Sequence, residues 1–238
     1  IMNKLKIPRF ALLAFPLFLS ANPAEDASEI LVQSKATGGL IVQLGCGNGK
    51  LLAELGKDAR FLVHGLERDS SKIESARQII REKVTYGRVS AEHWGDPSRL
   101  PYSDNLVNLL LIEDSGELDN KEILRVLRPL GTALQRTGSG WKAIGKEWPE
   151  DIDEWTHFLH GPDGNAVSKD KRVGPPRHLQ WVGDPKFSRA HEQTASFSVA
   201  VTSRGRMFYV LDESPAVDIR VPSQWSLIAR DAFNGVIL

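Results

Sequence analysis

Leu44-Gly45-Cys46-Gly47-Asn48-Gly49 lies between a short apolar run, 40–44, and a helical pattern, 50–55. Glycine at alternate positions permits a tight strand-to-helix turn, and it lets the backbone approach a ligand more closely than any Cβ would allow. The N-terminus of the following helix adds unpaired N–H groups and a partial positive charge. The stretch therefore predicts an α/β domain that binds a small molecule at this turn.

Strand and helix patterns alternate through the first half of the chain. The periodicity predicts helices at 27–35, 50–55 and 121–127 and strands at 40–44, 61–67, 84–90, 106–112 and 132–134. A further helix is expected to begin with a capping box, Ser71 and Glu74, and to bury Ile73, Ala76 and Ile80. Strands that alternate with helices imply βαβ units and a parallel sheet.

Two common phosphate-binding motifs do not match the glycine turn. A P-loop needs glycine where Leu44 stands and serine or threonine where Leu51 stands. The dinucleotide fingerprint G-x-G-x-x-G places its third glycine one position later than Gly49. The observed spacing is G-x-G-x-G.

With the residues before it, 42–49, this spacing resembles motif I of class I S-adenosyl-L-methionine (SAM)-dependent methyltransferases. Three later stretches, 65–70, 100–105 and 122–131, resemble in the same order that family's second-strand motif, its L-P-F-x-D-x loop and its helix-to-turn motif. Glu67 follows the turn by roughly twenty residues, where a strand-end carboxylate can accept the ribose hydroxyls. The similarity covers about 100 residues.

The resemblance implies a Rossmann-like parallel sheet over 27–137, with SAM as the cofactor. It also implies the cofactor-binding residues, of which Ala91 and Glu92 would meet the adenine. The whole set is Gln43, Gly45, Cys46, Gly47, Asn48, Gly49, Glu67, Arg68, Ala91 and Glu92.

Two departures from the family bear on catalysis. Gln43 and Asn108 stand where the family usually has carboxylates, and both are expected at strand ends that line the cofactor cleft. Glu92 and His93 are the candidates for a general base, although a solvated pair is the simpler interpretation. Methyl transfer to an unidentified acceptor and a binding domain that has lost catalysis therefore both stay open.

The composition changes after a glycine-rich stretch, 138–150, which is expected to be a linker. Residues 155–165, 175–181 and 227–238 resemble the entry segment and the repeat of PQQ-like (quinoprotein-type) β-propellers. Residues 151–238 are then the first blade of a propeller, with a hairpin at 197–211 and a tight turn at 231–235. This adds a third possibility, a quinoprotein-type oxidoreductase.

PQQ itself is disfavoured, because such dehydrogenases commonly show two adjacent cysteines and this chain has only Cys46. No metal is predicted, since no spacing matches a strong metal motif. The side chains that could compose a metal site are His157, His160, Asp163, His178, His191 and Glu192.

The N-terminus predicts export to the periplasm or to the cell surface. Residues 1–24 combine three basic side chains, a short apolar run and small residues where a signal peptidase would cleave. This combination is typical of a secretory signal peptide. The run is too short to span a bilayer, so no membrane span is expected after cleavage. Thirty basic and thirty acidic residues give no net charge that would favour nucleic acid. Because Ile1 precedes Met2 and Leu238 ends in a predicted strand, we expect a fragment of a longer protein.

Overall fold

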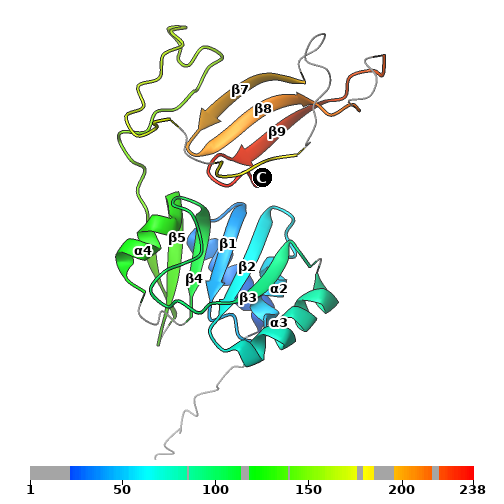
Figure 1. The fold of residues 1–238 in the computed structure, drawn as a ribbon, viewed down its shortest axis with the longest axis vertical. Helices are drawn as coiled ribbons and strands as arrows, with labels where there is room; N and C mark the ends of the chain where they lie inside the picture. Colours follow the sequence, from blue (N-terminus) through cyan, green and yellow to red (C-terminus); the bar gives the residue numbers. More distant parts are fainter. Residues whose placement is uncertain are drawn as a thin grey trace, which may run out of the picture.

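The computed structural model describes residues 22–84, 86–113, 118–138, 140–175, 179–184, 196–215 and 220–238. A six-stranded sheet with helices lies below a three-stranded antiparallel sheet in Figure 1. The predicted fold class, a parallel α/β domain followed by a β-rich segment, is confirmed. No described helix has the length and hydropathy needed to cross a membrane.

The six-stranded sheet has the order β3-β2-β1-β4-β5-β6. Its parallel strands are β1 (Gly39–Leu44), β2 (Phe61–Glu67), β3 (Val89–His93), β4 (Val107–Ile112) and β5 (Leu127–Thr137), and β6 (Gly140–Gly145) runs antiparallel to β5. The chain leaves β1 toward β2 and β3, and then continues from β4 on the other side of β1. The strand order therefore reverses between β1 and β4, which is where open α/β sheets bind ligands, at the carboxyl ends of the strands.

Helices cover both faces of this sheet. The helices are α1 (Pro23–Ser34), α2 (Lys50–Leu55), α3 (Ser70–Lys83) and α4 (Asn120–Val126). Side chains of α1, α2 and α3, among them Ile30, Leu52 and Ile80, pack on one face, and Ile123 and Val126 of α4 pack on the other. Every residue of β1 and β4 is buried, as their apolar sequences require for strands covered on both sides.

Several predicted boundaries were wrong. Asp69, rather than Ser71, caps α3, because its carboxylate accepts the Ser71 N–H at 3.0 Å. The first helix begins at Pro23 rather than 27, behind the N-cap Asn22, so the end of the predicted leader belongs to α1. The predicted linker, 138–150, contains β6, whose backbone pairs along β5. Strand β3 begins later than predicted and β5 is longer, at 11 residues.

The second sheet is a meander of β7 (Phe197–Ser203), β8 (Arg206–Asp212) and β9 (Trp225–Asp231). The predicted hairpin and its turn at Arg204 and Gly205 are confirmed. The predicted turn after β9 is also present, closed by the Gly235 N–H on the Asp231 carbonyl at 2.9 Å. Beyond it, Ile237 forms a bridge with Arg230, and the Leu238 N–H donates to the Ala229 carbonyl at 2.9 Å, so the last residues pair with β9.

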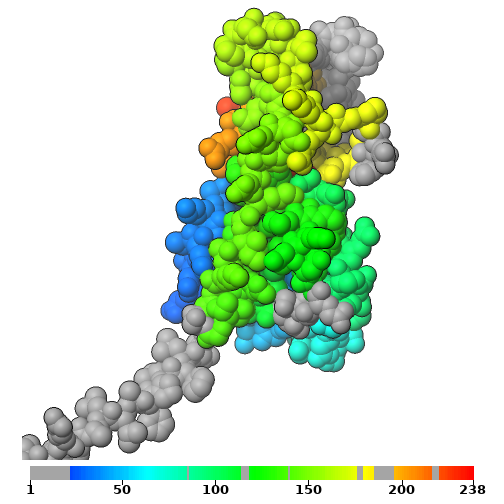
Figure 2. Space-filling model, turned by 90° about the vertical axis from the view of Figure 1, so that its left-hand side faces the viewer, coloured from blue at the N-terminus to red at the C-terminus, as the bar shows by residue number. Residues whose placement is uncertain are grey.

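The second sheet sits on the amino ends of the parallel strands. In Figure 1 the second sheet lies above the six-stranded sheet, and in Figure 2 the yellow-green stretch after β6 runs up the side that faces the viewer. Asn234 Nδ2 donates to the Leu106 carbonyl at 2.8 Å and to Asn108 Oδ1 at 2.6 Å. Asn108 lies near the amino end of β4, so its predicted place at the cofactor cleft was wrong.

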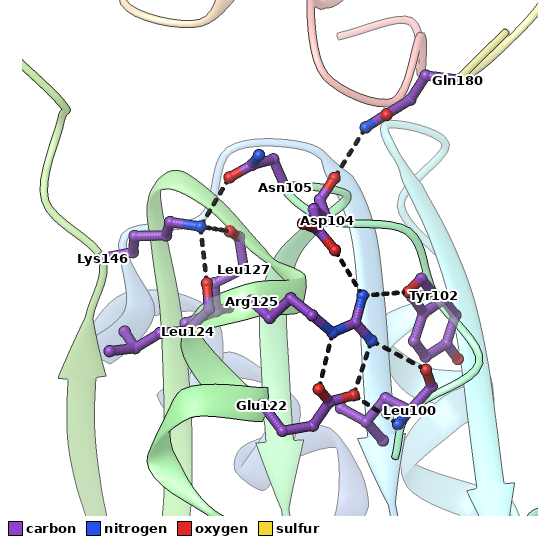
Figure 3. A network of polar contacts seen from close by, with 10 residues as sticks. All are labelled: Leu100, Tyr102, Asp104, Asn105, Glu122, Leu124, Arg125, Leu127, Lys146 and Gln180. Atoms are coloured by element: carbon purple, nitrogen blue, oxygen red, sulfur yellow. Dashed lines mark hydrogen bonds and ion pairs between the residues drawn. The ribbon is translucent and has the colours of Figure 1, made fainter. Parts of the chain in front are cut away.

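A network around Arg125 fixes the loop before β4 (Figure 3). Its guanidinium donates to both oxygens of Glu122, each at 2.7 Å, and to Asp104 Oδ1 at 2.8 Å. It also donates to the carbonyls of Leu100 and Tyr102. Two of the stretches that resemble methyltransferase motifs, 100–105 and 122–131, are therefore joined by structural contacts at the amino edge of the sheet.

Candidate functional site

The glycine turn lies at the carboxyl end of β1, next to the point where the strand order reverses. Gly45, Gly47 and Gly49 have φ angles of 76°, 54° and 75°, in the left-handed region that favours glycine. The Gly45 N–H donates to the carbonyl of Leu66 in β2 at 2.8 Å. The chain thereby turns sharply from β1 into α2.

The last two glycines of the turn have different surroundings. A Cβ on Gly49 would lie 3.1 Å from Ala76, so this glycine allows α3 to approach the turn closely. A Cβ on Gly47 would meet no described atom within 4 Å. The space above Gly47 is therefore open to a ligand.

Glu67, at the end of β2, is joined directly to the turn. Its Oε2 accepts the Gly47 N–H at 2.7 Å, and its Oε1 accepts the backbone N–H groups of Arg68 and Asp69 at 3.0 and 3.1 Å. The residue is 6% exposed. A carboxylate has about four acceptor sites, so Oε2 keeps capacity for one more donor while Oε1 is filled. The structure thus brings the predicted ribose-binding carboxylate to the predicted glycine turn.

Gln43 is buried in β1, one residue before its end. Its Oε1 accepts no hydrogen bond from any residue that the structure describes. A buried acceptor without a partner costs free energy, so a ligand donor at this position would be favourable. Gln43 cannot supply the negative charge of a carboxylate, but its Oε1 is available as an acceptor for a ligand.

The remaining predicted contacts differ in exposure. Cys46 is buried, and burial, assisted by the Glu67 charge, raises the pKa of its thiol to about 12. Asn48 is exposed, and its Oδ1 accepts the Lys50 N–H at 3.2 Å. Ala91, in β3, lies beside Gly65 of β2 and is fully buried.

The two general-base candidates belong to β3 itself rather than to the loop after it. Glu92 is largely exposed, and its Oε2 lies 3.9 Å from His64 Nε2, away from the turn. His93 is exposed, and its Nε2 lies 3.2 Å from the Arg68 carbonyl. These contacts do not bring Glu92 and His93 to the glycine turn.

Glu113 is a residue that the sequence analysis missed. It directly follows β4, and its N–H donates to the Leu44 carbonyl at 3.1 Å, which places it beside the end of β1. Burial raises the pKa of its carboxyl, against the opposing effect of Arg136, whose Nε lies 3.3 Å away. Its position directly after an almost entirely apolar strand was the signal that could have found it.

The metal candidates that the structure describes do not converge. No group of three or more histidine, cysteine, aspartate or glutamate side chains in the described ranges is arranged to hold a metal ion. His160 Nε2 instead lies 2.7 Å from Asp153 Oδ2, and His157 Nδ1 lies 2.9 Å from Thr156 Oγ1. Asp163 Oδ1 accepts the Asn165 N–H at 3.3 Å, and the remaining candidates, His178, His191 and Glu192, lie outside the described residues.

Comparison with known proteins finds neither a matching family model nor a matching curated protein. Solved structures do match part of the chain. A candidate SAM-dependent methyltransferase from Methanococcus maripaludis is 22% identical, with 48% of this chain and 53% of that chain covered and a TM-score of 0.40. The [4+2]-cyclase SpnF is 23% identical, with coverages of 49% and 47% and a TM-score of 0.42.

A geranyl diphosphate methyltransferase in complex with SAM is 21% identical, with coverages of 47% and 48% and a TM-score of 0.41. The chain therefore spans about half the length of the solved structures that it matches. The chemistry of this site has to be inferred from its own residues.

Proposed function

We propose that the six-stranded domain binds SAM at the carboxyl edge of its sheet and serves as a methyltransferase-like domain. The observation that carries this proposal is the 2.7 Å hydrogen bond between the Gly47 N–H and Glu67 Oε2. It joins a turn with open space above it to a carboxylate oxygen with spare acceptor capacity. Both lie beside the reversal in strand order, where this class of sheet binds nucleosides.

The described residues fit such a ligand in two respects. Glu67 Oε2 would accept one ribose hydroxyl, whereas Oε1 is already filled by backbone donors. The unpartnered Gln43 Oε1 would accept a donor such as an ammonium group. Glu113 places an acidic residue beside the end of β1, where its carboxylate is paired with Arg136.

SAM supplies an electrophilic methyl group when bound. The contribution of the chain would be to hold the ligand in a fixed orientation, since alignment of two reactants is a large part of catalysis. The acceptor would be a small molecule that enters the same edge of the sheet.

A second candidate is a domain that binds the same ligand without transferring its methyl group. The positions of Glu92 and His93 favour this alternative, because the contacts of their side chains are to His64 and to the Arg68 carbonyl rather than to the glycine turn. Methyl transfer from isotopically labelled SAM to a panel of small nucleophiles distinguishes the two candidates: transfer supports the enzyme, and binding without transfer supports the alternative.

We also propose that residues 1–24 direct export and that residues 151–238 begin a PQQ-like propeller with a binding or oxidoreductase function. The three-stranded meander and its Asp231–Gly235 turn support the propeller, which needs further blades to bury its faces. Export of a fusion to a reporter enzyme by residues 1–24 would test the first proposal.

Isothermal titration of the whole chain with SAM tests ligand binding. We expect micromolar affinity that falls by about tenfold or more in Glu67→Gln, since hydrogen bonds to charged groups contribute about 1.5–3 kcal/mol. Glu74→Gln, an exposed change on α3, is the matched control and should bind normally. Absence of binding in the wild-type chain, or equal affinity in both variants, would show that the turn is not a SAM site.

A further inference from the structure

A second recess lies at the junction of the two sheets, on the edge opposite to the glycine turn. Its volume is about 220 Å³. The loop after α1 and the β7–β8 turn form opposite walls, with Lys35 and Thr37 on one side and Arg204 and Arg206 on the other. In Figure 2 these parts, blue and orange, meet at one edge of the molecule. Arg128, from the start of β5, also lines the recess.

The recess is strongly positive. Three arginines and one lysine line it, and no carboxylate side chain is among its lining residues. Burial lowers the pKa of Arg128 against the opposing charge of Asp231, and Arg206 lies close enough for its charge to lower that pKa further. Like charges repel in a partly desolvated site, so an anion between them would be stabilising.

The nearby carboxylates are already engaged. Asp231 Oδ2 lies 3.0 Å from Arg128 Nε, but Asp231 also accepts from Asn108 Nδ2 and from the backbone N–H groups of Phe233 and Asn234. Arg128 Nε is buried against Asp231 and is not a donor to the recess. Glu154 accepts the backbone N–H of Arg204. In the described ranges the guanidinium groups of Arg204 and Arg206 form no ion pair with a carboxylate, so they keep donors for a ligand.

The donors come from two parts of the chain and are held in place. Arg206 Nη2 donates to Thr37 Oγ1 at 3.4 Å, across the recess. Lys35 and Arg204 each adopt a positive φ, of 56° and 48°, which fixes the direction of both loops. A bound anion would therefore bridge the two sheets.

We propose that this recess binds a small oxyanion that carries at least two negative charges, such as a phosphate monoester. Guanidinium groups bind phosphate oxygens in pairs of parallel hydrogen bonds, and the flanking lysine and threonine add further donors. A volume of 220 Å³ is below the usual range for drug-sized ligands, about 300–1,000 Å³, which matches a small phosphorylated molecule. The site is separate from the proposed SAM site.

The test is isothermal titration of the whole chain with inorganic phosphate at constant ionic strength, adjusted with chloride. We expect binding that is weakened by about tenfold or more in the double variant Arg204→Gln/Arg206→Gln, because two charge-assisted interactions are lost. The matched control is Arg81→Gln/Arg172→Gln, which removes two exposed arginines on other surfaces. The control should bind as the wild type does.

Two outcomes would overturn the proposal: no binding of phosphate by the wild-type chain at about 10 mM, or equal weakening in both double variants, which would indicate a general charge effect. A thermal unfolding series provides an independent readout, since phosphate should raise the Tm of the wild type but not of Arg204→Gln/Arg206→Gln. SAM titration of the same variant should be unchanged, which keeps this test distinct from that of the proposed function.

Discussion

Asn108 Nδ2 donates a hydrogen bond of 2.7 Å to Asp231 Oδ2, and the two residues are 5% and 1% exposed. The oxygen of the same amide accepts the Leu40 N–H at 2.8 Å and Asn234 Nδ2 at 2.6 Å. Asn108 thus uses both ends of its amide to join β1 to the turn after β9. An aspartate at this position would lack the donor and would place a second carboxylate against Asp231. The amide is therefore explained by docking of the second sheet rather than by the chemistry of the cofactor site.

The first prediction concerns this pair. Asn108→Asp should destabilise the chain by about 3 kcal/mol, because an uncompensated buried charge costs about that much. Urea unfolding followed by tryptophan fluorescence measures the change. The exposed variant Asn120→Asp, at the first position of α4, should change the stability little.

The double variant Asn108→Asp/Asp231→Asn extends this test. It restores an amide–carboxylate pair with its direction reversed, so it should recover a substantial part of the lost stability. If the loss of stability in the double variant equalled the sum of the losses in the two single variants, the two side chains would not interact as the structure indicates.

The position of Asn108 also shows which contacts could be predicted from the sequence and which could not. The predicted strand, 106–112, already placed Asn108 near its amino end, so its assignment to the cofactor edge disregarded strand direction. Its partner Asp231 is 123 positions away, and no local pattern could reveal that contact. By contrast, the junction of Gly47 and Glu67 was predictable, because adjacent parallel strands place their carboxyl ends together.

Strand β6 and Glu113 were missed for different reasons. Gly140–Gly145 has glycine at both ends and an irregular pattern, and it is a strand because β5 offers a free edge with which it pairs. Glu113 was predictable from its position directly after an almost entirely apolar strand, but the family pattern points to Gln43 and Asn108 instead. Tertiary pairing thus accounts for one omission and reliance on the family pattern for the other.

The second prediction separates the two roles of the glycine turn. Gly49→Ala should destabilise the chain by about 2 kcal/mol, because a positive φ is unfavourable for alanine and its Cβ would crowd Ala76 at 3.1 Å. Gly47→Ala should cost only about 1 kcal/mol, since its Cβ would meet no described atom. Chemical unfolding measures both values.

The same variants should rank differently in SAM titrations. The methyl group of Gly47→Ala enters the open space above the turn, so we expect its affinity to fall by about tenfold despite its small effect on stability. If Gly47→Ala bound SAM as tightly as the wild type, the ligand would not lie above Gly47.

The third prediction concerns His64, which is mostly buried in β2. Its Nδ1 lies 2.7 Å from the Tyr102 hydroxyl, and burial lowers its pKa despite the opposing charge of Glu92. The unfolded chain therefore takes up this proton more readily than the folded chain, and stability should fall as the pH drops below about 6.5.

The contribution of His64 to this slope is at most about 1.4 kcal/mol per pH unit. Urea unfolding at several pH values between neutral and mildly acidic should show a shallower slope in His64→Gln, which cannot take up a proton. His157→Gln, a change at an exposed histidine, should keep the wild-type slope. Equal slopes in all three proteins would mean that His64 is protonated equally in both states.

The last prediction uses Cys46, the only cysteine of the chain. Burial and the Glu67 charge raise the pKa of its thiol to about 12, while an unfolded cysteine has a pKa near 8.5. The thiolate is the reactive form, so the native chain should react slowly with a disulfide reagent at pH 8 and rapidly once unfolded in guanidinium. Because only the unfolded chain ionises between these two pKa values, stability should also decline as the pH rises through that interval.

The thiol lies within the glycine turn, so its native labelling rate reports local opening of the proposed site. SAM should therefore slow the labelling in the wild type but much less in Glu67→Gln, and rapid labelling of the native chain would contradict the buried position of Cys46.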